Sequence, residues 1–508
     1  MLKRNKLCLL LAGFIVFCLA GQAQAFDLEE KVVKTKLENG LTVLMVTREF
    51  SPTVSLYIRF RVGAVDEIKG QSGAAHFLEH MMFKGTSSIG TKDYRAEKKL
   101  LGQIESIGQA LDNEKMRQTK ADPELIEKLA ARLKQLQDEH RQYYIPNEID
   151  RLYTQNGGQD MNASTGQDVT TYHISLPANK IELWARIESD RLVNPVFREF
   201  YSERDVILEE RRQRVETRPE GKLYESFMST AYRVHPYGWP ILGWPEDLTA
   251  MSQTAIRQIH RKYLAPENIV IAVVGHIHPP TILKLIDRYF GRIPKGSSAP
   301  AVIPPEPPQT HERRIEVLFD ANPMMMIGYH KPNAPAFEDD VFDVLETILS
   351  RGRTSRLYAR LVMELQIAQS ISVHNGLPAS RYPNLFAIIA HPRHPHTNVD
   401  IEAVLLEEID KIKSHPVPDE ELAKAKKQMK MDYLKSLDSN SQLASILSYY
   451  ELLLGDYRYF SDYIARIDRV TATDLMAAAR KYLTKENRTV AYLTAKKDET
   501  MEADRHEK

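Results

Sequence analysis

Two histidines and a glutamate stand close together in residues 72–86, and their spacing suits metal chemistry. The pattern is His76-x-x-Glu79-His80. If this segment is a helix, His76 and His80 lie one turn apart and point in the same direction. Two imidazoles placed in this way can hold one zinc ion, and the carboxylate of Glu79 lies beside them as a base for a metal-bound water. The alternative is an amphipathic helix whose histidines are simply packed among apolar neighbours.

A second stretch, residues 198–215, is densely charged and has a helical period. Its residues Glu203 and Glu210 are seven positions apart, which is two turns, so they share one face of the helix. Most such runs form a solvated, salt-bridged surface. The other interpretation is that one of these carboxylates completes the metal site, since a zinc ion held by two histidines and one carboxylate keeps a position for water.

The segments around the histidines read mainly as strands. Residues 32–46 alternate apolar and polar residues around Asn39-Gly40, which predicts a β-hairpin. Residues 53–65 form another strand pattern, and residues 169–174 form a further β-rich run after a turn-rich segment. Strand, strand and then helix predicts the start of an α+β layer.

Residues 93–144 read as a helical hairpin inserted into the first domain. The segment is rich in charge, and leucines and isoleucines recur at helical spacing in two stripes. Between the stripes, Asp122-Pro123 is typical of a helix start with proline at the first helical position. The insertion is either structural, or a lid or contact surface for a partner.

Two segments far apart in the chain repeat one another. KYLAPENIVIAVVG (262–275) and KYLTKENRTVAYLT (481–494) share Lys, Tyr, Leu, Glu and Asn in register, 219 residues apart. A proline-rich stretch at 294–312 predicts a stiff linker. We therefore expect two similarly folded domains, 26–293 and 313–494, of which the second has no counterpart of the histidine motif.

The N-terminal residues 1–25 have the pattern of a signal peptide. A basic start is followed by a short apolar run and then by Ala23-Gln24-Ala25, which fits a cleavage site. An uncleaved anchor is the alternative, although the apolar run is short for a bilayer span. Both cysteines, Cys8 and Cys18, fall in this segment, so the mature chain would contain no disulfide.

Composition limits the possible partners and compartments. The 68 basic residues are balanced by 68 acidic ones, so neither nucleic acid nor an anionic membrane is an expected partner. A signal peptide before a cysteine-free mature chain favours a bacterial periplasm, with secretion as the alternative and no membrane segment after cleavage. The last residues, 495–508, form a polar tail.

These features resemble a known family, the pitrilysin/insulinase-type zinc metallopeptidases, which are inverzincins related to the mitochondrial processing peptidase. The landmarks are LENGLTVLMV, GQSGAAHFLEHMMFKGT, Asn162-Ala163, ERDVILEE, HPYGWPILGW and the paired KYL-x-x-EN segments. They span nearly the whole mature chain. The resemblance implies an α+β fold in which two similar α/β-sandwich domains, joined by the proline-rich linker, form half of a clamshell peptidase.

The resemblance also implies roles for single residues. His76 and His80 match the histidines that bind one Zn²⁺ per chain, and Glu79 matches the general base. The third ligand falls at Glu210 rather than Glu209, and Glu203 would support the site. The gap of 130 residues between His80 and Glu210 is longer than is usual in the family, and the inserted hairpin accounts for the excess.

The same resemblance suggests a substrate and a reaction. Asn162 and Ala163 match the edge strand to which a peptide is thought to add as a further β-strand. We therefore expect an exported zinc-dependent endopeptidase that hydrolyses oligopeptides or unfolded segments by Glu-assisted attack of a zinc-bound water. The alternative is a non-catalytic peptide-binding or assembly subunit on the same fold.

One departure from the family concerns the second domain. Many members carry there an arginine and, seven residues later, a tyrosine that hold substrate across the chamber. The matching positions here are Val362 and Gln369, which cannot bind a substrate carbonyl in that way. Arg356 or Tyr358 could act instead, but their helical spacing favours ordinary packing. We expect a homo- or heterodimer in which a zinc-free homologous subunit supplies the missing pair.

Overall fold

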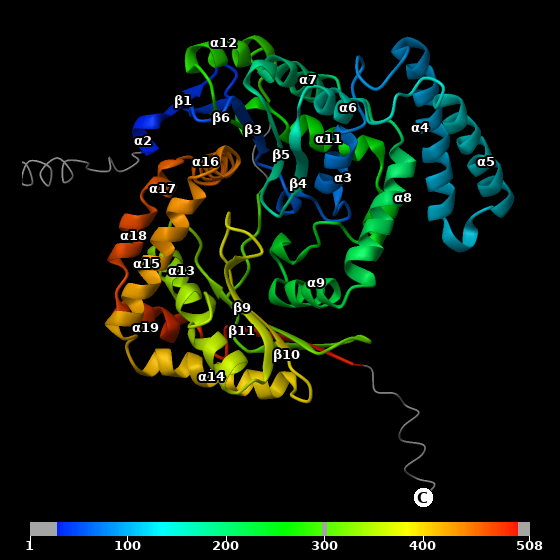
Figure 1. Ribbon diagram of the computed structural model, residues 1–508. Helices are drawn as coiled ribbons and strands as arrows, with labels where there is room; N and C mark the ends of the chain where they lie inside the picture. The colour runs from blue at the N-terminus through cyan, green and yellow to red at the C-terminus, as the bar shows by residue number, and fades with distance from the viewer. Residues whose placement is uncertain (1–27, 297–301, 496–508) are drawn as a thin grey trace, which may run out of the picture.

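The computed structural model describes residues 28–296 and 302–495, which form two α+β units, each built on one sheet (Figure 1). The expected signal peptide, part of the linker and nearly all of the polar tail lie outside the described residues. Within the described ranges, no helix is both long and apolar enough to cross a bilayer.

Six strands make the first sheet, in the order β1-β2-β6-β3-β5-β4. Their bounds are β1 Val32–Lys36, β2 Thr42–Thr47, β3 Thr53–Phe60, β4 Gln159–Thr165, β5 Thr170–Pro177 and β6 Ile269–Gly275. β2 and β6 run parallel, and the other neighbours run antiparallel. The predicted hairpin is confirmed, because Val32 of β1 pairs with Val46 of β2.

The prediction for β3 was wrong at its C-terminal end. The strand stops at Phe60 rather than Val65, and the chain turns into the short 3₁₀ helix η1, Ala64–Asp66. The backbone N–H groups of Ala64 and Val65 donate to the carbonyl oxygens of Gly166 and Gln167 instead of continuing the ladder. A loop 102 residues further along the chain thus ends the strand, and local alternation carries no signal of it.

One face of the first sheet is covered by helices of the first unit. These helices are α3 Ala74–Met82, α6 Glu148–Gln155, α7 Ile181–Val193, α11 Gln253–Tyr263 and α12 Pro279–Phe290. Their buried side chains, among them Phe77, Trp184 and Phe290, form one core with Leu56 and Ile58 of β3. α3 and its histidines are therefore held against the sheet by apolar packing.

The inserted segment forms two long helices, α4 Tyr94–Met116 and α5 Pro123–His140, which lie side by side at the edge of the first unit (Figure 1). The Asp122 side chain accepts hydrogen bonds from the first-turn N–H groups of α5, and Pro123 stands at the first helical position. Tyr201 of α8 (Phe200–Arg211) packs on α4 at Gly108, where a Cβ would lie 2.0 Å from its ring.

The second sheet has five strands in the order β7-β11-β8-β10-β9. Their bounds are β7 Arg313–Leu318, β8 Met324–Lys331, β9 Ala368–Leu377, β10 Asn384–Pro392 and β11 Arg488–Thr494. One face packs against helices of the second unit, which are α13 Phe337–Ser350, α14 Asn398–Ser414, α15 Asp419–Ser436, α18 Tyr463–Arg469 and α19 Ala472–Tyr482. The fold is thus mixed α and β in both units, as expected.

The repeated segments occupy equivalent places in the two sheets. The first forms β6, which lies between the parallel β2 and the antiparallel β3. The second forms β11, which lies between the parallel β7 and the antiparallel β8. A helix precedes each of them, α11 and α19 respectively. The internal repeat in the sequence therefore corresponds to a repeated fold.

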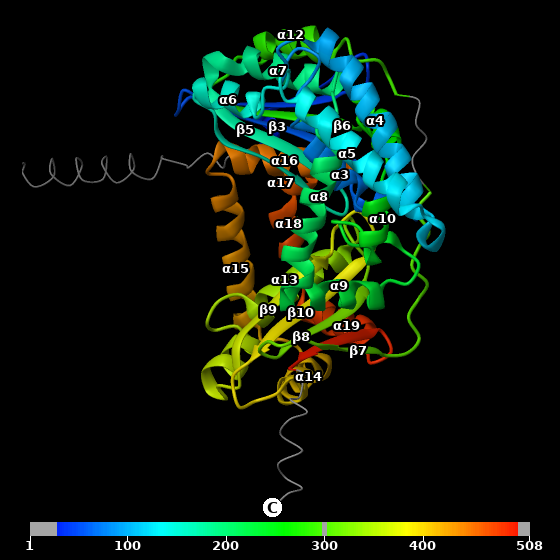
Figure 2. The same cartoon turned by 90° about the vertical axis from the view of Figure 1, so that its right-hand side faces the viewer.

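The two units also exchange helices across their interface, which the sequence did not predict. α16 (Asn440–Leu454), from the second half of the chain, packs with Leu443 and Leu447 on the other face of the first sheet. α9 (Pro219–Ala231), from the first half, packs with Leu223 and Phe227 on the other face of the second sheet. Figure 2 shows both contacts from the side. The central strands of each sheet, such as β6 and β8, are buried on both faces in consequence.

Candidate metal centre

Helix α3 carries the histidine motif, and a carboxylate holds its N-terminus. Glu67 is buried and accepts hydrogen bonds from the backbone N–H groups of Gly73 (2.9 Å) and Ala75 (2.7 Å). Gly73 has a φ of 86°, and a Cβ there would lie 2.8 Å from the carbonyl oxygen of Leu242. The oxygens of Glu67 satisfy N–H groups that a helix start leaves without a partner, although burial raises the pKa of Glu67 well above its usual value. Glu67 therefore sets where the helix begins and how its side chains point.

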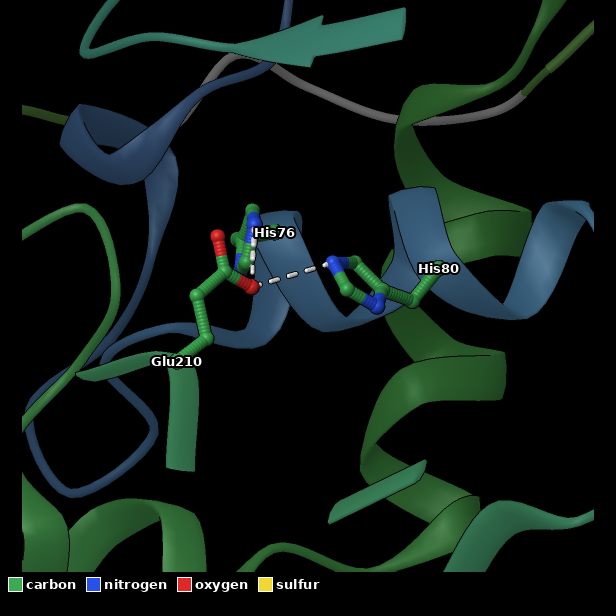
Figure 3. A group of neighbouring side chains, drawn as sticks. All are labelled: His76, His80 and Glu210. Carbon is green, nitrogen blue, oxygen red and sulfur yellow. Dashed lines mark ion pairs between the residues drawn. The ribbon is translucent and has the colours of Figure 1, made fainter. Parts of the chain in front are cut away.

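His76 and His80 both face Glu210 of α8, as Figure 3 shows. Glu210 Oε2 lies 3.8 Å from His76 Nε2 and 3.5 Å from His80 Nε2. The three candidate ligand atoms all lie within 4.8 Å of one another. Among the residues that the structure describes, this is the one compact group of three or more His, Cys, Asp or Glu side chains that could hold a metal ion.

The contact of His80 with Glu203 leaves the Nε2 lone pair of His80 available. His80 Nδ1 lies 2.8 Å from Glu203 Oε1, which places the proton on Nδ1 and makes Nε2 the acceptor. Burial, and then the nearby His80, lower the pKa of His76 to about 3, so its imidazole is neutral. Two imidazoles and a carboxylate that converge without ordinary hydrogen bonds between them fit the donor set of a catalytic zinc ion.

Glu203 lies behind His80, where the sequence predicted it. It also contacts Lys84 Nζ at 2.5 Å, and Lys84 contacts Glu199 at 3.2 Å. Burial raises the pKa of Glu203, but the hydrogen bonds from His80 and Lys84 outweigh burial and lower it overall. Glu203 is therefore ionised at neutral pH and orients the His80 ring. Lys84 was not anticipated, although its place one turn after His80 was a usable signal.

Glu79 lies beside the three candidate metal ligands and has a hydrogen-bond partner that the sequence analysis missed. Thr165 Oγ1 donates a 2.5 Å hydrogen bond to Glu79 Oε2. Burial raises the pKa of Glu79 above its usual value, which is the direction that general acid–base catalysis near neutral pH requires of a carboxylate. Thr165 is the last residue of β4, so the edge strand and the carboxylate meet at this hydrogen bond.

Glu210, and not Glu209, completes the cluster. Glu209 is exposed and pairs with Arg212 at 2.6 Å on the outer face of α8. Glu210 Oε1, the oxygen turned away from the cluster, lies 3.0 Å from Arg214, which sequence reasoning also missed. The face-sharing argument for Glu203 and Glu210 therefore agrees with the geometry.

The expected substrate-binding pair lies on the edge of the first sheet. Asn162 and Ala163 are in β4, which pairs with β5 and has no second strand partner within the described residues. The Asn162 side chain accepts a hydrogen bond from the backbone N–H of Ala163 at 2.9 Å. An edge strand with free hydrogen-bonding groups can accept an additional strand.

In the second domain, the positions considered for holding substrate across the chamber form no such pair. Val362 is buried in the core of the second unit, in the π-helical turn η7 (Tyr358–Glu364), and Gln369 is exposed at the start of β9. Arg356 is held by Glu421 through two hydrogen bonds of 2.8 and 2.7 Å, and Tyr358 packs against the same core. Both side chains have packing roles, as their spacing suggested.

Sequence profiles of known families cover most of the chain. The profile described as "Insulinase (Peptidase family M16)" matches residues 42–137 and 139–244. The profile described as "Peptidase M16 inactive domain" matches residues 250–429. The first therefore contains the histidine motif and Glu210, and the second covers most of the unit that lacks such a motif.

Individual relatives match over nearly their whole length. The zinc protease PqqE of Helicobacter pylori is 27% identical over 493 residues, which cover 95% of this chain and 97% of the relative. An uncharacterized zinc protease of Mycobacterium leprae is 25% identical over 465 residues, which cover 89% of this chain and 90% of the relative.

Solved structures have the same fold. The crystal structure of a protease from Helicobacter pylori superposes with a TM-score of 0.77 at 24% identity, over 91% of this chain and 99% of that one. The periplasmic protease PqqL of Escherichia coli superposes with a TM-score of 0.68 at 18% identity, over 92% of this chain but 48% of that one. The present chain thus corresponds in fold to about half of PqqL.

Proposed function

Because the chain belongs to the insulinase family of peptidases, peptidase family M16, we propose that it is a zinc-dependent endopeptidase that hydrolyses oligopeptides or unfolded segments. The observation that carries this proposal is the convergence of His76 Nε2, His80 Nε2 and Glu210 Oε2 beside the buried carboxylate of Glu79. The relatives named zinc proteases support the choice of metal.

The residues of the chain divide the chemistry between them. One Zn²⁺ held by His76, His80 and Glu210 would polarise the scissile carbonyl group and make water a better nucleophile. Glu79 takes the proton of the attacking water and delivers it to the leaving amine. Thr165 holds the Glu79 side chain in place through its hydrogen bond, and Glu203 holds the ring of His80.

The edge strand β4 positions the peptide. An extended peptide that adds beside Asn162 and Ala163 runs along β4 toward Thr165, and so toward the carboxylate that Thr165 contacts. The side chain of Asn162 must then release the N–H of Ala163. This mode of binding reads the backbone of the substrate, which favours oligopeptides and unfolded segments over folded proteins.

We further propose that the active form is a dimer. This chain matches 48% of PqqL, so a second unit of similar size would complete an arrangement like the whole of that protein. Val362 and Gln369 offer no substitute for the arginine and tyrosine of other members, which a zinc-free homologous subunit would have to supply. PqqL is described as a periplasmic protease, which supports the proposal that residues 1–25 direct the export of this chain.

The test is zinc content and cleavage of a quenched peptide library by the mature chain, beside Glu79→Gln. We expect about one zinc per chain in both proteins, and efficient cleavage only by the wild type and only once the second subunit of the dimer is present. Cleavage that survives Glu79→Gln would refute the role of this carboxylate. Zinc in both proteins without cleavage in either would favour the dimer, and adding the partner subunit should then restore activity.

Neighbouring glutamates provide a matched control for the metal site. Glu210→Gln removes an anionic oxygen from the cluster and should lower zinc content, whereas Glu209→Gln breaks an exposed ion pair with Arg212 and should not. Equal zinc contents in these two variants would contradict the assignment of Glu210 as a ligand.

A further inference from the structure

The inserted hairpin, α4 and α5, lies against α8, the helix that carries two carboxylates of the candidate metal centre. In Figure 1, α8 stands between α3 and the hairpin. Tyr201 and Glu203 are two positions apart in α8, which turns them about 200° away from each other. Glu203 contacts His80 on α3, whereas Tyr201 contacts α4. The helix that supplies Glu210 is therefore held from two opposite sides.

Tyr201 makes a close contact between α8 and the hairpin. Its ring lies on Gly108 of α4, where an added Cβ would come within 2.0 Å of the ring. Its hydroxyl donates to the backbone carbonyl oxygen of Glu105 at 3.2 Å. Tyr201 is 8% exposed, Phe200 meets its ring at 86°, and the Arg204 guanidinium lies over the ring. The ring has little room to turn away, so a change at Gly108 passes to α8.

A buried ion pair is the second tie between α8 and the hairpin. Arg204 of α8 donates to Asp112 of α4 through two hydrogen bonds of 2.7 and 2.8 Å. The two side chains are 10% and 16% exposed, so solvent screens the pair only weakly. Because a bidentate pair has a fixed direction as well as a fixed length, it sets how the two helices lie relative to each other.

The base of the hairpin ties α8 to the loop that follows α3. Glu97 of α4 accepts hydrogen bonds of 2.6 and 2.9 Å from Arg198, and His140 of α5 lies 2.7 Å from the same carboxylate. Arg198 stands two residues before α8, and it also donates to the carbonyl oxygens of Lys84 and Thr86 at 2.9 and 2.8 Å. Glu97 and Arg198 are fully buried. The hairpin is thus joined to both helices of the metal centre.

We propose that the inserted hairpin positions α8 against α3, so that Glu203 and Glu210 stand at distances from the histidines that suit one metal ion. Tyr201, Gly108 and Asp112 are then positioning residues, because they act on the metal centre through the placement of α8. The inference rests on the proposed peptidase function and gives the insertion a part in it. A change in the hairpin that touches no metal ligand should therefore alter zinc affinity.

Two glycines of α4 provide a matched test. Gly108→Ala places a methyl group against Tyr201, whereas Gly102→Ala in the same helix meets no neighbouring atom within 4 Å in the described part of the chain. Both substitutions favour the helical backbone equally, so they differ in the contact with α8. Zinc affinity is measured by competition with a chelator of known affinity. We expect about tenfold weaker binding in Gly108→Ala and binding within about twofold of the wild type in Gly102→Ala.

A double variant shows whether the effect passes through the tyrosine. Tyr201→Leu removes the ring atoms that a Cβ at position 108 would meet. The double variant Gly108→Ala/Tyr201→Leu should therefore bind zinc within about twofold of Tyr201→Leu alone, because two changes that share one contact are not additive. A tenfold loss that persists in the double variant would show that Gly108→Ala acts by another route.

The ion pair provides independent variants, which also serve if Gly108→Ala folds poorly. Asp112→Ala breaks the tie to Arg204 and should weaken zinc binding about tenfold. Asp340→Ala breaks the pair of Asp340 with Arg466 in the second unit, whose side chains are similarly buried, and should leave zinc affinity within about twofold of the wild type. Both variants leave a buried arginine unpaired, so a loss in Asp112→Ala alone separates positioning from general destabilisation.

Hydrogen–deuterium exchange of the metal-free chain reads how firmly α8 is held. In Gly108→Ala the amides of residues 200–211 should exchange at least about threefold faster than in Gly102→Ala, while those of α13 should exchange equally in both. Equal exchange in α8, or equal zinc affinities in the two glycine variants, would overturn the inference. If the wild type binds no zinc, the zinc peptidase proposal fails, and the exchange rates of α8 alone decide the inference.

Discussion

The role of Glu203 can be measured as a change in zinc affinity. Its carboxylate accepts the Nδ1–H of His80 at 2.8 Å and is largely buried, with 13% of its side chain exposed. Glu203→Gln keeps a neutral acceptor, and because a charge-assisted hydrogen bond is about twice as strong as a neutral one, we expect about tenfold weaker zinc binding. Glu203→Ala removes the acceptor, so we expect about a 100-fold loss, or ~2.7 kcal/mol.

The assay is competition for zinc against a chelator of known affinity at fixed pH. Glu199→Gln is the control, because Glu199 also contacts Lys84, at 3.2 Å, but makes no hydrogen bond or ion pair with His80 in the described part of the chain. We expect this variant to bind zinc within twofold of the wild type. Zinc affinity that is unchanged in Glu203→Ala, or lowered equally by Glu199→Gln, would refute the argument that Glu203 acts by orienting the imidazole.

Three further predictions concern the metal, the core and pH. Chelation with 1,10-phenanthroline should abolish cleavage, and added Zn²⁺ should restore it, while far-UV circular dichroism stays unchanged because both cores are built from apolar side chains; loss of the helical signal would contradict this. Arg198→Met leaves the buried Glu97 without its bidentate partner, so the free energy of unfolding measured in urea should fall by about 3–5 kcal/mol. An unchanged urea midpoint would show that this ion pair is not needed for stability. Burial, and then Asp339, raise the pKa of Asp343 to about 7, so the native state holds this proton more tightly than the unfolded chain, and stability should fall as pH rises from about 4 to about 7. Asp343→Asn should remove up to about 4 kcal/mol of this pH dependence in urea titrations at several pH values, and an identical slope in the variant would contradict the assignment.

Local patterns predicted much of the fold. Asn39-Gly40 indicated the β1–β2 hairpin, and Asp122-Pro123 indicated the start of α5, because turns and helix caps depend on residues that are close in the chain. The repeated KYL-x-x-EN segments indicated two similar units, since each ends in the same arrangement of strands. The end of β3 was misjudged, because a distant loop takes over its hydrogen bonds.

The partners of the candidate catalytic groups could not be derived in the same way. Thr165 lies 86 residues from Glu79, and Glu67 holds Gly73 and Ala75 through a turn that no periodicity describes. The packing of α9 and α16 on each other's sheets was likewise absent from the sequence analysis, because an apolar helix face does not state which sheet it covers.

The sequence by itself determined the chemical identity of the candidate centre. His76, Glu79 and His80 are neighbours on one helix, so their geometry follows from backbone periodicity alone. Only the tertiary structure decided that Glu210 meets them at a distance suited to one shared ion, that Thr165 contacts Glu79 and that Lys84 and Arg214 join the surrounding charges. These features arise where separate elements pack together, and such long-range contacts are determined by the complementarity of whole surfaces rather than by local spacing.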